Sequence, residues 1–222
     1  MFFIYIIYIF AKKKKEMGSL LRKEDEKCSD IVSNFLNEHF YLKKCSSFER
    51  VDDKERQIQG IDVIFSFNNK TFICDEKAAI RYVNKNLKTF SMELSFIDRS
   101  GKIHDGWLLD NKKTNDSFLF IWVDKAKNDI LKSKADIQEL EFGLVYKKDI
   151  IEYLNKIGWN KTKLVQKSEL IRNDESEYCG DLYKDGCKFV CSRFLYEKPV
   201  NVLLKRDTLK KISVYNEKIV IN

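Results

Sequence analysis

The clearest alternation of hydrophobic and polar positions lies in the stretch QIQGIDVIFSFNNKTFICDEK, residues 57–77. Two apolar runs rich in β-branched and aromatic residues flank a pair of asparagines. Such a pattern predicts a β-hairpin. Because successive side chains of a strand point to opposite faces, we expect Asp75 and Lys77 on one face of the second strand and Glu76 on the other.

Other elements follow from the same kind of pattern. Apolar residues spaced by three and four predict a helix over residues 20–42, and a strongly apolar run predicts a central strand at 117–123. The stretch 140–146 fits either a strand or the approach to a helix. Further strands are predicted at 89–97, 189–196 and 200–204, and further helices at 147–157 and 206–213. The predicted fold is α/β, with a mixed central β-sheet flanked by helices.

The length of 222 residues suits one domain, or one domain with an appendage. A single proline and few glycines give no sign of a linker. We therefore divide the chain into an N-terminal apolar and basic extension (1–16), a core (17–125) and a C-terminal part (126–222). The C-terminal part is expected to complete the same domain or to contact substrate.

The N-terminal extension begins MFFIYIIYIF and continues into four lysines. Ten apolar residues are too few for a helix to span a bilayer, and the order of charge and apolar run is not that of a secretory signal. The extension could be a short membrane-surface anchor. We prefer the alternative that Met17 is the true start and that residues 1–16 are not native, so no stable membrane partner is expected.

Composition adds charge and redox information. The formal charge is +7, and outside the first sixteen residues the bias is mildly basic, which fits a nucleic-acid partner without requiring one. Three of the six cysteines, Cys179, Cys187 and Cys191, lie close together but without a C-x-x-C pair or a nearby histidine, so a zinc site is not favoured. Reduced cysteines and a cytoplasmic location are expected.

The predicted hairpin carries charged groups at one end. Asp62 stands at the start of its first strand, and Asp75 and Lys77 stand at the end of its second strand. Two carboxylates can bind a hard divalent cation through oxygen, and a lysine beside them can hold or polarise a water. In the alternative interpretation, Asp62 caps a turn while Asp75 and Lys77 form an exposed ion pair on an edge strand.

This arrangement resembles the core of the PD-(D/E)xK nuclease superfamily, in residues 20–125. The first part of the signature reads Gly60-Ile61-Asp62, with Ile61 at the proline position, and the second part reads Asp75-Glu76-Lys77. The resemblance implies a restriction endonuclease-like fold and magnesium-dependent hydrolysis of phosphodiester bonds in DNA. Asp62 and Asp75 would ligate Mg²⁺, with Mn²⁺ as an alternative, and Lys77 would orient the attacking water.

Three further groups are candidate site residues. In the resembled family, the helix before the hairpin often supplies a glutamate, for which Glu24 and Glu26 are candidates here. Glu24 leads into the apolar stripe and is expected to point inward, although an acidic first turn also suits the helix dipole. Gln57 could orient a water or a phosphate, or be a surface residue. Glu93 lies in an apolar strand and could be a supplementary ligand or a solvent-facing side chain.

Two other function classes stay open. The chain could be a catalytically inactive nuclease-like module that binds nucleic acid or a protein, or an unrelated α/β interaction protein with a fortuitous D-x-K. The presence of all three signature side chains favours the enzyme, for which a homodimer is one open arrangement. No P-loop, dinucleotide fingerprint or H-E-x-x-H motif occurs, so those activities have no support.

Overall fold

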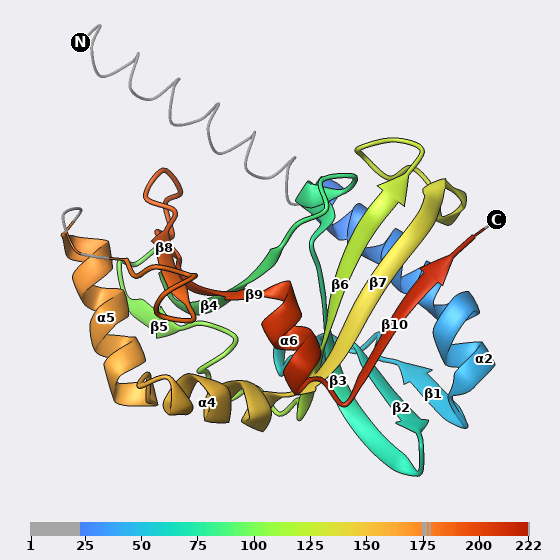
Figure 1. Ribbon diagram of the computed structural model, residues 1–222, viewed down its shortest axis with the longest axis horizontal. Helices are drawn as coiled ribbons and strands as arrows, with labels where there is room; N and C mark the ends of the chain where they lie inside the picture. The colour runs from blue at the N-terminus through green and yellow to red at the C-terminus, as the bar shows by residue number, and fades with distance from the viewer. Residues whose placement is uncertain (1–22, 175–176, 178, 222) are drawn as a thin grey trace, which may run out of the picture.

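The computed structural model describes residues 23–174, 177 and 179–221 (Figure 1). The extension 1–16, and with it the question of whether Met17 is the start, lies outside these residues. The described chain is built from two β-sheets with helices packed against them.

The larger sheet has six strands in the order β1-β2-β3-β6-β7-β10. β3 and β6 are parallel and the other neighbours are antiparallel, so the sheet is mixed and flanked by helices, as predicted. Its third and fourth strands lie at the centre, which confirms the central position of the run at 117–123. The strands are β1 (Ser47–Arg50), β2 (Val63–Phe67), β3 (Lys70–Ala78), β6 (Ser117–Ala126), β7 (Ile137–Tyr146) and β10 (Tyr215–Val220).

The predicted hairpin is confirmed as β2 and β3. Phe67 pairs with Lys70, so the connection is the two residues Asn68 and Asn69. Both asparagines have positive φ, 50° and 61°, as a type I′ turn requires. Asparagine tolerates this conformation better than most residues, and the turn fixes the register that later places Asp62 opposite Asp75.

A second sheet has the order β5-β4-β9-β8. The predicted strand at 89–97 forms in this second sheet, where it pairs with β5 and β9. The late strand predicted at 189–196 ends earlier, because the chain turns after Cys191. The strands are β4 (Thr89–Ile97), β5 (Ile103–Asp105), β8 (Lys188–Cys191) and β9 (Val200–Lys205).

The N-terminal helix covers residues 23–36 and continues through η1 (Asn37–Tyr41) into α2 (Leu42–Lys44). The helices predicted at 147–157 and 206–213 form, whereas α3 and α5 were not predicted. Throughout the described ranges, every helix is too short or too polar to traverse a lipid bilayer. The remaining helices are α3 (Lys54–Ile58), η2 (Ile80–Tyr82), η3 (Lys134–Asp136), α4 (Lys147–Lys156), α5 (Lys161–Asn173) and α6 (Arg206–Ile212).

The six-stranded sheet is buried on both faces. The N-terminal helix packs its apolar stripe, including Phe35 and Phe40, on one face. The second sheet and helices α4, α5 and α6 pack on the other, where Phe120 and Trp122 of β6 meet Met92 of β4. Figure 1 shows the second sheet beside the larger one, with α6 between them. Two apolar layers thus hold β3, the strand that carries Asp75, inside the protein.

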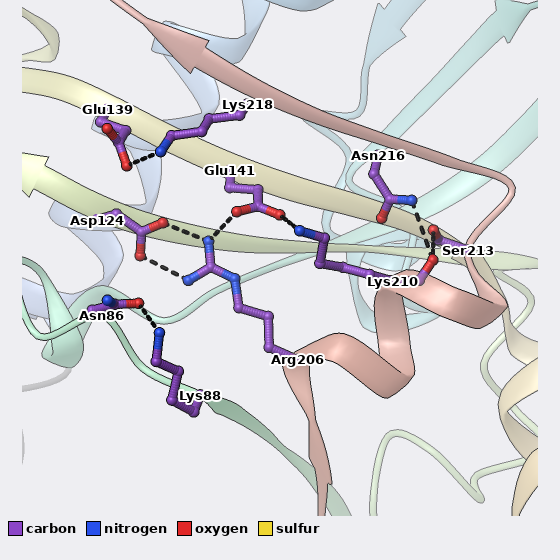
Figure 2. Close-up of polar contacts among 10 residues, drawn as sticks. All are labelled: Asn86, Lys88, Asp124, Glu139, Glu141, Arg206, Lys210, Ser213, Asn216 and Lys218. Atoms are coloured by element: carbon purple, nitrogen blue, oxygen red, sulfur yellow. Dashed lines mark hydrogen bonds and ion pairs between the residues drawn. The ribbon is translucent and has the colours of Figure 1, made fainter.

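A cluster of ion pairs joins α6 to the larger sheet (Figure 2). The Arg206 guanidinium donates two hydrogen bonds to Asp124 of β6, at 2.8 and 2.5 Å, and one to Glu141 of β7, at 2.6 Å. It also lies over the Trp122 ring, 4.7 Å from the centroid. Lys210 pairs with the other oxygen of Glu141. We call Arg206, Lys210, Asp124, Glu141 and Trp122 the Arg206 cluster. Its ion pairs connect α6 to β6 and β7 of the larger sheet.

Candidate active site

The hairpin brings Asp62 and Asp75 together. Val63 pairs with Cys74, and the same register places Asp62 opposite Asp75. Backbone contacts fix this end of the pair: Asp62 N–H donates to Cys74 O at 3.0 Å, and Glu76 N–H donates to Asp62 Oδ2 at 2.8 Å. Asp75 also acts directly on the pKa of the Asp62 carboxyl, so the two acidic groups are neighbours.

The environment of Asp62 favours its protonated form. Burial, followed by repulsion from Asp75, raises the pKa of the Asp62 carboxyl to about 7, although Lys77 and the Glu76 N–H act in the opposite direction. Two carboxyl groups this close cannot both ionise easily without a cation between them. The pair is thus poised to exchange a proton for a metal ion near neutral pH.

Lys77 completes the signature. Its Nζ lies 2.6 Å from Asp75 Oδ1 and 5.3 Å from the centroid of the Trp107 ring. Asp75 is only 2% exposed, and its strand lies between β2 and β6. The alternative of an exposed ion pair on an edge strand is therefore wrong. The lysine is held between a carboxylate and an aromatic face, with its side chain still partly open to solvent.

Asn115 was not identified from the sequence, yet its amide oxygen lies at the carboxylate pair. A Cβ built on Gly60 would lie 3.0 Å from Asn115 Oδ1 and 3.4 Å from Asp75 Oδ2, so both oxygens face one side of Gly60. The amide nitrogen donates to Ser117 O at 3.0 Å, which fixes the orientation of the amide. Asn115 is 4% exposed, and among the residues that the structure describes its Oδ1 has no hydrogen-bond partner.

Such an orphaned oxygen is costly, since a buried acceptor without a partner loses about 1–3 kcal/mol of solvation. A cation at the carboxylate pair would supply the missing partner. In the described part of the chain, no group of three or more Asp, Glu, His or Cys side chains could hold a metal ion. A metal here would therefore depend on the two carboxylates and on neutral oxygen donors such as Asn115 Oδ1.

Glu76 points to the opposite face of β3, as predicted. Its carboxylate accepts hydrogen bonds from Ser33 at 2.6 Å, Tyr41 at 2.7 Å and Arg50 at 2.6 Å. The first two donors come from the N-terminal helical segment and the third from β1. This network holds the strand end in place, and because the Glu76 N–H binds Asp62, it also fixes that carboxyl group.

A cavity of ≈ 360 Å³ opens between Asp62 and the N-terminal helix. Gln57 lines it and is anchored through Nε2 to Val51 O at 2.8 Å, so a substrate-facing role for Gln57 stays a prediction. The expectation that Glu24 points inward is wrong, because Glu24 and Glu26 are both exposed. The cavity is reached instead by the next turns of the helix, from Ser29 through Asp30 to Asn37.

Glu93 of β4 lies near Lys77, on the opposite face of β3 from this cavity. Burial raises the pKa of its carboxyl, whereas Lys77 and the Trp107 backbone N–H lower it. Gly106 permits this approach, since a Cβ there would come within 2.5 Å of the Glu93 backbone. The interpretation of Glu93 as a purely solvent-facing residue is therefore wrong, and its side chain is half-buried near Lys77 and Trp107.

Three lysines surround the loop that carries Asn115. Lys113 Nζ donates to Ile58 O at 2.6 Å, Lys147 Nζ to Asp110 O at 3.4 Å, and Lys161 Nζ to Leu109 O at 3.0 Å. Burial lowers the pKa of the Lys147 ammonium, and neighbouring Lys161 and Lys113 act in the same direction. These positive charges concentrate beside the carboxylate pair, where they would attract a polyanion.

Within the described ranges, the cysteines belong to no group of three or more potential metal ligands. All six are free thiols, and burial raises the pKa of Cys187 to about 11.

No protein-family model, curated protein or solved structure matches the chain. The assignment of function therefore depends on the geometry of the site itself.

The carboxylate pair should make the stability of the metal-free protein fall as pH rises. The pKa of Asp62 is higher in the folded chain than its ordinary value of 3.8, so the folded state binds the proton more tightly between about pH 4 and pH 7. At about 1.4 kcal/mol per unit, discounted for partial exposure, we expect a loss on the order of 2 kcal/mol across that window. Thermal unfolding as a function of pH measures it.

Magnesium should remove most of that loss above pH 7, because a cation replaces the shared proton. In Asp62→Asn, both the pH slope in this window and the magnesium effect should disappear. A wild-type protein with pH-independent stability between pH 4.5 and 8 in chelator, or an Asp62→Asn variant with the wild-type slope, would contradict this assignment.

Proposed function

We propose that the protein is a metal-dependent nuclease that hydrolyses phosphodiester bonds in DNA, built on a restriction endonuclease-like core. The observation that carries the proposal is the hairpin register that places Asp62 opposite Asp75, with Lys77 Nζ 2.6 Å from Asp75 Oδ1. An acid at the start of one strand and acid-x-Lys on its antiparallel partner is the arrangement expected for this superfamily. The six-stranded mixed sheet is compatible with such a core.

The donor set fits magnesium or manganese. Asp62, Asp75 and Asn115 offer only oxygen, and hard divalent cations prefer carboxylate and carbonyl oxygen. The unpartnered Asn115 Oδ1 supports a third donor beside the carboxylates. The remaining coordination positions would be left to water and to the phosphate of the substrate, which is typical of Mg²⁺ sites in enzymes that process phosphates.

Each side chain then has a distinct task. When bound, the metal would lower the pKa of an attacking water and neutralise charge on the phosphate. Lys77, fixed by Asp75 and Trp107, would orient the water and stabilise the additional negative charge on the phosphate oxygens. Asp62, with a pKa near neutrality in the metal-free chain, gives up its proton as the site fills. Glu93 is placed to accept a proton near Lys77.

DNA is proposed as the substrate on two grounds. The first is the resemblance of the signature to DNA nucleases. The second is the charge around the site, where Lys113, Lys147 and Lys161 gather within a chain of net charge +7. Lysines in this position would contact phosphates on either side of the scissile bond, without reading sequence.

The direct test is cleavage of single-stranded, duplex and branched DNA in the presence of Mg²⁺ or Mn²⁺. We expect metal-dependent cutting of at least one substrate and none in chelator. Asn115→Leu should raise the metal concentration needed for half-maximal rate by about tenfold or more, since a supporting ligand of this kind is worth about 10–100-fold. The matched control is Asn155→Leu, at an exposed asparagine of α4, which should cut like the wild type.

The possible outcomes separate the function classes. Binding of DNA without cutting, under all metal conditions, would replace the enzyme by an inactive nuclease-like module. Neither binding nor cutting would make the D-x-K motif a coincidence. Cutting that persists in chelator would contradict the metal centre, although the chain would still be a nuclease.

A further inference from the structure

The loop between β8 and β9, residues 192–199, is held firmly and yet exposes large aromatic side chains. We call it the aromatic loop. Its backbone closes on itself, with Ser192 N–H donating to Pro199 O at 3.1 Å and Leu195 N–H to Ser192 O at 3.0 Å. Arg193 Nη2 donates to Ile171 O and, at 3.2 Å, to Asp174 O, so the loop is also tied to the end of α5.

Two rings stand out from this fixed backbone. Phe194 is 73% exposed and Tyr196 is 63% exposed, with the apolar Leu195 between them. The Tyr196 hydroxyl donates to Arg99 O at 3.2 Å, which restrains the ring against the turn between β4 and β5. Exposed aromatic rings contribute nothing to the core, but restrained rings offer a flat surface that loses little entropy on binding.

The surroundings of the aromatic loop are basic. The loop and the neighbouring turn 98–102 contain Arg99, Lys102, Arg193 and Lys198, against the acidic Asp98 and Glu197. Asp98 is engaged within its own turn, accepting hydrogen bonds from Ser100 and from the Lys102 backbone. A surface that combines flat aromatic groups with excess positive charge complements a ligand that has flat bases and a negative backbone.

The aromatic loop also borders the candidate active site. Ile97 N–H of β4 donates to Glu197 O at 2.7 Å, so the loop lies along the same strand that carries Glu93. Glu197 lies close enough to Glu93 to raise the pKa of that carboxyl, and Lys77 acts on it from the other side. The aromatic loop is thus joined to the strand that brings Glu93 to the candidate site.

We propose that the aromatic loop binds unpaired bases of a nucleic-acid strand by stacking them on Phe194 and Tyr196. The substrate class that follows is DNA with a single-stranded segment, rather than uninterrupted duplex. This inference rests on the proposed function for the path of the strand, but the stacking itself does not require cleavage. It can therefore be tested in chelator, where the two proposals fail in different ways.

The test compares equilibrium binding of two oligonucleotides of about 16 nucleotides, one of thymidylate and one abasic, by fluorescence anisotropy in EDTA. Both carry the same phosphates, so only the first can stack. The wild-type chain should prefer thymidylate, and Phe194→Ala with Tyr196→Ala should weaken thymidylate binding by about 30-fold or more, leaving abasic binding unchanged. Phe194→Tyr with Tyr196→Phe should keep the preference.

Tyr183→Ala is the matched control, since Tyr183 is 85% exposed but lies over Lys205, at the other end of the second sheet. It should bind like the wild type. If the double alanine variant keeps the wild-type preference for bases, the stacking inference is overturned while cleavage by the wild type would still support the nuclease. If the wild-type chain binds neither oligonucleotide, the stacking inference also fails. Equal loss in Tyr183→Ala would show general surface binding and overturn it too.

Discussion

Asp75→Asn is expected to lower the rate of metal-dependent DNA cleavage by about a thousandfold or more, because it removes a ligand charge and breaks the contact with Lys77. Lys77→Met should lower the rate by about a hundredfold to a thousandfold, since it removes one positive group from the phosphate. The two variants should differ in binding: calorimetry should detect Mg²⁺ binding in Lys77→Met but not in Asp75→Asn. The rates are measured by single-turnover cleavage, with enzyme in excess over DNA. The rate without metal is subtracted as background.

Lys70→Met is the matched control for Lys77→Met, because both lysines belong to β3 and Lys70 is exposed at its other end. It should cut at the wild-type rate. Each variant should still be folded at the assay temperature in chelator, which thermal unfolding verifies, so that a loss of rate is not a loss of fold. A Lys77→Met enzyme with wild-type rate would remove the lysine from the mechanism, and an active Asp75→Asn would remove the site.

Arg206→Met should be the most destabilising single change outside the hydrophobic core. Arg206 is 6% exposed and is the common partner of Asp124 and Glu141. Removing one side of a buried ion pair leaves uncompensated charge and costs about 3–5 kcal/mol. For a chain of this size we expect the midpoint of thermal unfolding to fall by about 10 °C or more, measured by circular dichroism.

Lys218→Met is the control from the same region. Lys218 pairs with Glu139 at 2.6 Å but is half exposed, so its loss should lower the unfolding midpoint far less than Arg206→Met does. Replacing Asp124 by leucine in the Arg206→Met background should recover part of the stability, because it removes one of the two carboxylates that the first change leaves unpaired. Equal effects of Arg206→Met and Lys218→Met would show that the Arg206 cluster behaves as a surface network.

The hairpin was predictable because every local signal agreed. Alternation set the faces, Asn68 and Asn69 set the turn, and the register followed from both. The chemistry at its end was visible for the same reason, since Asp62, Asp75 and Lys77 are close both in sequence and in the hairpin. The helix predicted over residues 20–42 likewise rests on a regular stripe, and it forms with a π-helical turn near its end.

Helix α5 could not be predicted in this way, because its buried face is partly polar. Leu164 and Ile171 are buried, but so are Ser168 and Arg172. Both side chains meet Ser95 of β4, whose hydroxyl accepts a hydrogen bond from Arg172 and donates one to Ser168 at 3.0 Å. The alternation of hydrophobic and polar residues does not reveal a helix face whose buried side chains are partly polar and form hydrogen bonds.

The parts of the site that escaped prediction come from distant segments. Asn115 lies in a polar loop, and nothing in its local sequence separates it from the exposed Asn111. Its role depends on the parallel pairing of β3 with β6, which sets Cys74 opposite Ser117 and so brings the preceding loop to Asp75. The prediction that Glu24 points inward was wrong for a related reason. Which side of the first helical turn is buried depends on the distant segments that pack against it.

Both sheets are completed by the same late segment of chain. β9 pairs with β4 across more than a hundred residues, and β10 covers the edge of β7 soon afterwards. A ribosome that has made only the first 195 residues holds a chain with two open strand edges, each able to pair with another nascent copy. Completion of synthesis therefore competes with pairing between nascent chains. A slow stretch of translation before residue 200 would lower the yield of native protein.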